Sequence, residues 1–179
     1  MQSVFINQFG PQGPMPLREP LFHEVESFYA EAKKTNAHNA MGILISKISG
    51  ASAAEVDELP LTTLRQGQAY LLDFINHDPQ AFTGPSLEVT LEKMITSLNG
   101  QEAWQSVTVS EPTFAQFKTY YDKLEKGDSY AALLWLASDI SGVNLVALKK
   151  MPITKFREVE KYLLGFLRYF PEGTNGATS

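Results

Sequence analysis

Apolar side chains recur every three or four positions along most of this chain, which is the period of an amphipathic helix. Gly and Pro interrupt the period and divide it into segments, because neither residue favours a helix interior. The helices predicted in this way cover residues 20–34, 37–49, 52–58 and 61–77. Further along, one helix is predicted to open at Pro112 and to carry an apolar stripe at Phe114, Phe117, Tyr121 and Leu124. The next carries Ala132, Leu133, Leu136 and Ile140 and ends at Gly142 as a left-handed cap, a short helix covers about 144–150, and the last runs from Pro152 until Pro171 stops it.

Other stretches alternate apolar and polar residues, which predicts half-buried strands. Leu87–Glu92 and Val107–Val109 show this pattern. Between them, Asn99-Gly100 favours a type I′ turn, whose two central residues both need positive φ. We therefore predict a β-hairpin with an irregular first arm. A second hairpin, from Val4–Phe9 and Met15–Arg18, is less well defined because the prolines in this region disfavour regular pairing.

The chain aligns with itself without a gap when it is shifted by 92 residues. Residues 18–79 then lie on residues 110–171, and 19 of the 62 pairs are identical. The identical pairs include Glu19 with Glu111, Phe22 with Phe114, Gly50 with Gly142, Pro60 with Pro152, and Arg65 with Arg157. Helical periodicity alone does not align single Gly, Pro and Arg residues, so the match indicates a repeat.

The repeat predicts a tandem duplication of one structural module. Each copy is expected to be a β-hairpin followed by about four short helices, which makes the fold α+β and mostly α. The first copy is predicted to occupy residues 1–80, and the second copy residues 86–171. The last segment, 172–179, is small and polar, so we expect a flexible tail.

The composition narrows the possible functions. Of the 179 residues, 44% are hydrophobic and 20% are charged, as in ordinary globular proteins. The chain has no cysteine, which excludes disulfides and thiolate chemistry and is compatible with a cytoplasmic location. Its net charge of −5 disfavours nucleic-acid binding, which needs a concentrated basic patch. No apolar run reaches the roughly 18 residues of a membrane-spanning helix.

The residues that could carry chemistry do not form a known catalytic pattern. His23, His38 and His77 each lack a second ligand at helical spacing, so no metal site is predicted. Ser49 and Ser141 both precede a glycine, where a local structural role is expected. Phosphate-binding loops and nucleophile elbows are absent from the sequence. We therefore predict no catalytic residue and no cofactor, and a chain that is not an enzyme.

Aromatic residues in the last third of the chain exceed what one face of a helix can bury. The excess could pack between the two modules, or it could bind a partner. The candidate partner-binding residues are Trp135, Phe166, Tyr169 and Phe170.

The segment Val107–Phe114, which reads VTVSEPTF, is a strand that runs into a Pro-Thr helix start. A polar helix, an Ala- and Leu-rich helix ending in Ser-Gly, a short helix and a final helix ending at Tyr162–Leu167 follow. This order resembles the small tail-assembly chaperones of tailed bacteriophages, in particular the contractile-tailed ones. It is more weakly similar to phage baseplate-hub assembly proteins. The first module fits the same order from Arg18 to Phe74, although typical members have one module.

The resemblance implies a non-catalytic chaperone of phage tail or baseplate assembly. Such a protein binds the tape-measure protein, or another tail or baseplate protein, in the host cell cytoplasm during virion morphogenesis. A helix-in-groove contact would suit this role, and two modules would add avidity. Three alternatives stay open: a structural baseplate or tail component retained in the virion, a small acidic inhibitor of a host protein, and an enzyme.

Overall fold

The computed structural model describes residues 4–6, 15–125 and 129–167. The fold is α+β and mostly α, as predicted. Its N-terminal half, up to residue 79, contains β1 (Val4–Ile6), β2 (Met15–Leu17), α1 (Phe22–Lys34), α2 (Ala37–Ser49), α3 (Ala53–Asp57) and α4 (Leu61–Ile75). Its C-terminal half, from residue 86, contains β3 (Ser86–Thr96), β4 (Ala103–Ser110), α5 (Phe114–Leu124), α6 (Ser129–Ser141), α7 (Leu145–Leu148) and α8 (Ile153–Leu167).

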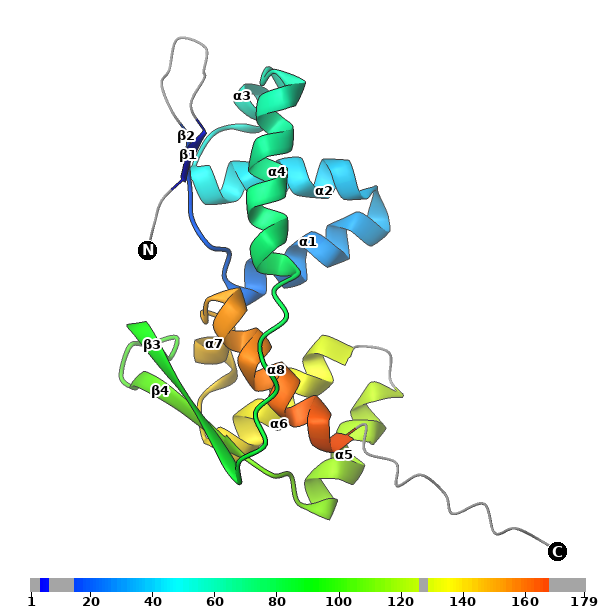
Figure 1. Cartoon of the computed structure of the whole chain (residues 1–179), viewed down its shortest axis with the longest axis vertical. Coiled ribbons are helices and arrows are strands. Elements are labelled where there is room, and N and C mark those ends of the chain that lie inside the picture. Colours follow the sequence, from blue (N-terminus) through cyan, green and yellow to red (C-terminus); the bar gives the residue numbers. More distant parts are fainter. Residues whose placement is uncertain (1–3, 7–14, 126–128, 168–179) are drawn as a thin grey trace, which may run out of the picture.

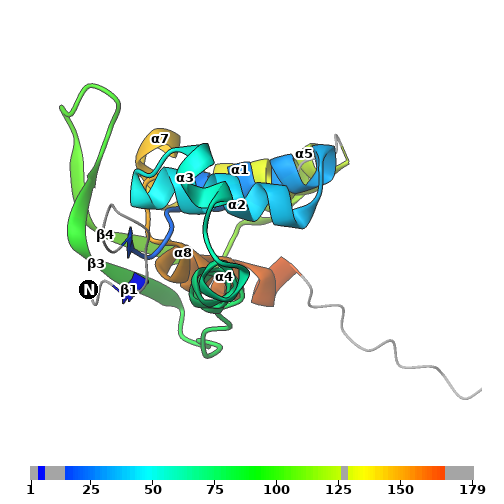
Figure 2. The same cartoon turned by 90° about the horizontal axis from the view of Figure 1, so that it is seen from above.

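The two halves are stacked along the long axis of the molecule (Figure 1). Viewed along that axis, α4 of the N-terminal half lies over α8 of the C-terminal half (Figure 2), and the two helices are in contact. The predicted tail 172–179 lies outside the described residues.

The β3–β4 hairpin is antiparallel and irregular in its first arm, as the alternating pattern predicted. Its register shifts between Thr90 and Ile95. One face buries Val89, Val107 and Val109 against α6 and α8, while the residues between them are exposed. Beyond the shift, Ile95 is again buried.

The turn of this hairpin is not type I′, so that prediction was wrong. Gly100 has the required positive φ of 69°, but Asn99 does not. The turn is wider than two residues, since the N–H of Ser97 bonds to the carbonyl of Glu102 at 3.0 Å. The Ser97 hydroxyl accepts from the Glu102 N–H at 3.1 Å and donates to Asn99 Oδ1 at 2.9 Å. These side-chain bonds favour the wider turn over the tight one.

The start of α5 also differs from the prediction. Thr113 is the N-cap and forms a capping box with Gln116, so Pro112 precedes the helix instead of opening it. The expected apolar stripe through Phe114 and Phe117 does not face the core. Tyr120 is the buried residue of this helix, and Phe114 is 73% exposed. The apolar period predicted this helix correctly. The side of α5 that packs on α6, however, is the one that carries Tyr120, not the one that carries Phe114.

Equivalent elements of the two halves match closely. α2 and α6 have the same length and begin and end 92 residues apart, and so do α4 and α8. Gly50 and Gly142, which follow α2 and α6, have φ of 78° and 70°, as predicted for left-handed caps. Ser49 and Ser141 each donate to the carbonyl four residues back, at 2.7 and 2.6 Å. The duplication itself stays a prediction, which these equivalences support.

The halves meet at a short antiparallel bridge. Segment Pro20–Phe22, at the start of α1, lies beside Met151–Ile153, at the start of α8, with Leu21 opposite Pro152. Backbone hydrogen bonds of 2.8 and 2.9 Å join the two segments. The ring of Phe22 packs on that of Phe156, with 4.1 Å between the centroids, and is 1% exposed. Burial of a ring of this size contributes about 2–3 kcal/mol.

Polar contacts surround this bridge. The Glu19 carboxylate accepts from the N–H of Thr154 at 2.9 Å. Lys149 forms an ion pair with Glu26 at 2.8 Å. Arg157 Nη2 donates to the carbonyl of Ile75 at 3.0 Å. The N-terminal half contributes the start of α1, whereas the C-terminal half contributes the start of α8. The two halves therefore use different surfaces, and the junction is head-to-tail.

Candidate protein-binding surface

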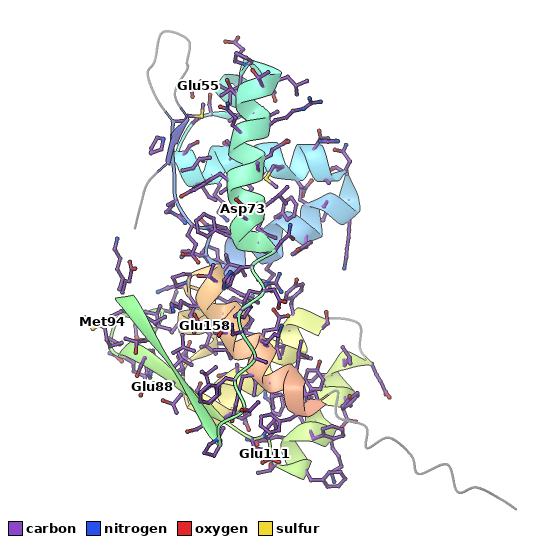
Figure 3. All side chains as sticks on the ribbon, viewed as in Figure 1. Glu55, Asp73, Glu88, Met94, Glu111 and Glu158 are labelled. Atoms are coloured by element: carbon purple, nitrogen blue, oxygen red, sulfur yellow. The ribbon has the colours of Figure 1, made fainter. Side chains whose placement is uncertain are left out.

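An open hollow lies between the linker that follows α4, the start of α5 and the end of α8. Its volume is about 610 Å³. These three segments supply its walls, and most of the side chains there are aromatic. The residues that matter for its chemistry are Phe82, Glu111, Phe114, Phe117, Tyr162 and Phe166. In Figure 3, Glu111 marks the place of the hollow, at the end of the molecule opposite Glu55.

Helical spacing places the aromatic rings of the hollow in pairs. Tyr162 and Phe166 lie one turn apart on α8 and meet edge to face, with 5.1 Å between centroids. Phe114 and Phe117 lie on the first turn of α5, with parallel rings 6.2 Å apart. The linker adds Phe82, whose ring centroid is 6.1 Å from that of Tyr162. The hollow therefore has a preformed aromatic lining drawn from three segments.

The Tyr162 hydroxyl bonds to the linker, and the negative charge of Glu111 at the edge of the hollow acts on it. It donates to the carbonyl of Gly84 at 3.2 Å. Burial raises the pKa of Tyr162 above its usual value, and the negative charge of Glu111 raises it further. On the other side, Lys118 Nζ lies 5.2 Å from the centroid of the Phe114 ring, in a cation–π contact. One acid and one base thus flank an aromatic surface.

The structure separates the residues that the sequence grouped together. Phe166 lines the hollow and is half-buried. Trp135 lies on α6, where its ring is 5.1 Å from Lys123 Nζ of α5. Within the described part of the chain, no ring contact joins Trp135 to Phe166. Tyr169 and Phe170 lie outside the described residues. Of the four candidates, Phe166 is therefore the one that the structure places in the hollow.

Sequence reasoning missed most of this surface. Phe114 and Phe117 were assigned to the core because their spacing suits a buried stripe. Tyr162 belongs to the aromatic cluster of the last third of the chain but was not chosen as a binding candidate, and Phe82 lies in a linker that has no periodic pattern. The repeat carried one usable signal, since Phe22 and Phe114 are equivalent in sequence. It could not show that only the first of them is covered.

A larger groove of about 720 Å³ runs under the linker beside α8. Its charged side chains are paired with each other: Lys161 bonds to Asp78 at 2.5 Å, and Arg157 bonds to Glu160. The hydrogen bond from Lys161 and its positive charge lower the pKa of Asp78. Because these charges satisfy one another and apolar exposure is lower, the aromatic hollow is the better candidate for a binding surface.

Among residues 4–6, 15–125 and 129–167, no three His, Asp or Glu side chains come close enough together to hold a metal ion. His23 Nδ1 lies 2.8 Å from the carbonyl of Lys149, at the junction of the halves. Every helix in these ranges is too short or too polar to cross a bilayer.

The arrangement offers an open, mostly apolar surface for another protein. Charged groups at its edge would orient a bound segment, and the rings would supply the contact area. Comparison with known proteins finds no family model, curated protein or solved structure that matches this chain.

Proposed function

We propose that this chain is a non-catalytic assembly chaperone of a bacteriophage tail or baseplate. It binds a tail component, such as the tape-measure protein, in the host cell cytoplasm during morphogenesis, and it uses no cofactor. The aromatic hollow is the observation that carries this proposal. Its rim residue Phe114 is 73% exposed, and half-buried rings of Phe117 and Phe166 continue the apolar surface inward.

The shape and chemistry of the hollow suit an amphipathic helix. A helix offers apolar side chains at positions i, i+3, i+4 and i+7, which can rest on a groove lined by aromatic rings. Tape-measure proteins are long and helical, and their apolar seams need a cover before the tube encloses them. The hollow carries few charges, so it favours such a seam over a charged partner. Glu111 at the mouth would orient a segment that carries a basic residue beside its apolar face.

One chain offers one open hollow of this kind within its described residues. The equivalent place in the N-terminal half holds Phe22 and Val25, which are both buried. The C-terminal half covers Phe22 at the junction. Avidity for a repetitive partner would therefore need more than one chain, because the two halves of a single chain do not present the surface twice.

Co-expression tests the proposal. The chain is produced with the tape-measure-like protein encoded beside it, and the soluble fraction of that protein is measured. We expect a soluble complex with the unchanged chain and loss of the complex with Phe117→Ala combined with Phe166→Ala. Leu98→Ala, at an 85% exposed position on the β3–β4 hairpin, is the matched control and should keep the complex. A partner whose solubility does not depend on the chain would overturn the proposal.

A structural subunit that stays in the virion is the second candidate. Exposed apolar side chains at opposite ends of the molecule favour it, since a subunit inside an assembly has neighbours on two sides. Leu61, at the start of α4, is 59% exposed, and Phe114 lies at the other end. Mass spectrometry of purified particles separates the two functions. A chaperone is absent from the finished particle, whereas a structural subunit is present in fixed copy number.

A further inference from the structure

We propose that this chain associates head-to-tail with a second copy of itself. The start of α4 in one copy docks on the start of α5 in the next. This contact repeats, between two molecules, the junction that joins the two halves within one molecule. The inference concerns self-association and does not depend on the chaperone function.

The proposal starts from the 92-residue equivalence of the two halves. The junction within the chain joins Glu19–Glu26 of the N-terminal half to Lys149–Arg157 of the C-terminal half. Each of these segments has an equivalent in the other half. Glu111–Lys118 is the equivalent of the first segment, and Asp57–Arg65 is the equivalent of the second. These two equivalents lie at opposite ends of the molecule, so they cannot meet within one chain.

Both equivalent surfaces expose side chains that the junction buries. Phe22 is 1% exposed, but its equivalent Phe114 is 73% exposed. Ile153 is 1% exposed, but its equivalent Leu61 is 59% exposed. A large apolar residue at each of these positions is useful only where a partner covers it. The chain covers Phe22 and Ile153 at the junction and leaves Phe114 and Leu61 exposed.

One polar pair of the junction is also retained. Glu19 accepts from Thr154, and their equivalents Glu111 and Thr62 keep the same side chains. The N–H groups of Phe22 and Ile153 bond across the junction.

The equivalent N–H groups are available for the same bonds. Those of Phe114 and Leu61 form no hydrogen bond with another described residue. A second copy would satisfy both of them through the carbonyls equivalent to those of Met151 and Pro20, which belong to Leu59 and Pro112.

Charge complementarity identifies the occupant as a second copy. In the junction, Lys149 pairs with Glu26 at 2.8 Å. The equivalents of these residues are Asp57 and Lys118, so both signs are reversed and the attraction is kept. Asp57 ends α3 and Lys118 lies in α5, and these two helices lie at opposite ends of the molecule (Figure 1). Contact between two copies is the arrangement that brings these opposite charges together.

The proposed contact joins two different surfaces, so it is heterologous. Each added copy leaves one surface of each kind free, and growth continues into an open chain or closes as a ring. The contact covers Phe114, which also forms the rim of the aromatic hollow. A second copy and a bound helix would therefore compete for this residue.

Sedimentation velocity of the full-length chain tests the proposal. We expect the mean mass to rise with concentration and to exceed that of a dimer. Leu61→Asp blocks one surface and Phe114→Asp blocks the other. Each variant alone should lose self-association by at least about tenfold, as at an interface hot spot. An equimolar mixture of the two variants should form a heterodimer and nothing larger, because each retains the surface that the other lacks.

A charge exchange provides a second, independent set of variants. Asp57→Lys and Lys118→Asp should each weaken association, and the double variant should restore it. Leu98→Asp on the β3–β4 hairpin is the control for an added charge at an exposed apolar position, and it should change nothing. Thermal unfolding of every variant confirms that the fold is intact.

Three results would overturn the proposal. The first is a chain that stays monomeric up to about 1 mM, the range of weak specific contacts. The second is an assembly that stops at a dimer and persists in Leu61→Asp, which would indicate a symmetric contact. The third is an equimolar mixture without heterodimer. None of these results would bear on the soluble complex expected in co-expression, so the two proposals fail separately.

Discussion

The carboxylate of Glu19 accepts hydrogen bonds from both the backbone N–H and the hydroxyl of Thr154, at 2.9 and 2.5 Å. The first residues of α8 are thus capped by a side chain from the other half of the molecule. A carboxylate just before a helix start, as Glu19 is before Pro20, ordinarily acts on the dipole of its own helix, here α1. The structure places it on α8 because the head-to-tail junction brings the two helix starts together.

Replacement of Glu19 by Gln should destabilise the chain by about 0.5–2 kcal/mol, the usual range for loss of a helix cap. Urea denaturation at low protein concentration measures this change. Glu111→Gln is the matched control, since Glu111 is the equivalent carboxylate and is exposed. We expect the control to change the free energy of unfolding by less than about 0.5 kcal/mol. Equal effects of the two substitutions would contradict the capping role.

Phe22 and Phe114 form a second matched pair. Phe22→Ala should cost about 3–5 kcal/mol, because it empties a buried site that packs on Phe156. Phe114→Ala should be within about 0.5 kcal/mol of the unchanged chain, because most of its ring faces solvent. Denaturant midpoints of the two variants, measured side by side, check this difference. A large loss of stability at Phe114 would show that its ring is covered in the monomer.

Two glycines of α2 should respond to alanine with opposite signs. Gly50 has φ of 78° at the C-terminal cap, and a Cβ there would meet no atom within 4 Å. Gly50→Ala should therefore cost about 1–2 kcal/mol from the backbone alone. Gly42 lies inside the helix, where an added Cβ would make an ordinary 4.0 Å contact with Val56. Gly42→Ala should stabilise the chain by about 0.5–1 kcal/mol. Melting temperatures check both signs.

Glu24 should make stability depend on pH. Burial opposes its ionisation, but bonds from Arg18 at 2.7 and 2.8 Å and from the Leu21 N–H outweigh burial, so the pKa of Glu24 is lowered. Its contribution, about 1.5–3 kcal/mol for charged hydrogen bonds, is present above the unfolded pKa of about 4.3. It is lost as the pH falls through the lower folded-state value.

Denaturation of the unchanged chain and of Glu24→Gln between pH 7 and pH 3 measures this contribution. The two should differ at neutral pH and converge in acid. Glu88→Gln, on an exposed position of β3, should follow the unchanged chain throughout. A gap between the chain and Glu24→Gln that persisted below the folded-state pKa would refute the assigned role of the charge.

The helices were largely predictable from the sequence, because period and capping residues are local signals. The range 37–49 predicted for α2 is the observed range, and the ends of 61–77 lie within two residues of those of α4. The turn at Asn99 was mispredicted because Ser97 bonds across it and holds a wider loop. Local propensity cannot include that competing side chain.

The junction and the aromatic hollow could not be predicted in this way. Phe22 and Phe114 occupy equivalent positions in equivalent sequences, yet one is buried and the other exposed. That difference arises from which neighbour each half meets, and the sequence of one half does not contain this information. The same limit explains why Trp135 and Phe166 were grouped together, although Trp135 lies beside Lys123 of α5 and Phe166 lines the hollow.

The cap that Glu19 places on α8 has a consequence for synthesis of the chain. A ribosome makes Glu19 first, and its partner Thr154 follows 135 residues later. At about 5–20 residues per second, the wait is roughly 7–27 s. During this time the start of α1 has no intramolecular cover, and a neighbouring nascent chain could supply the covering segment. Slow translation should therefore favour domain-swapped products, in which Glu19 of one polypeptide caps α8 of another.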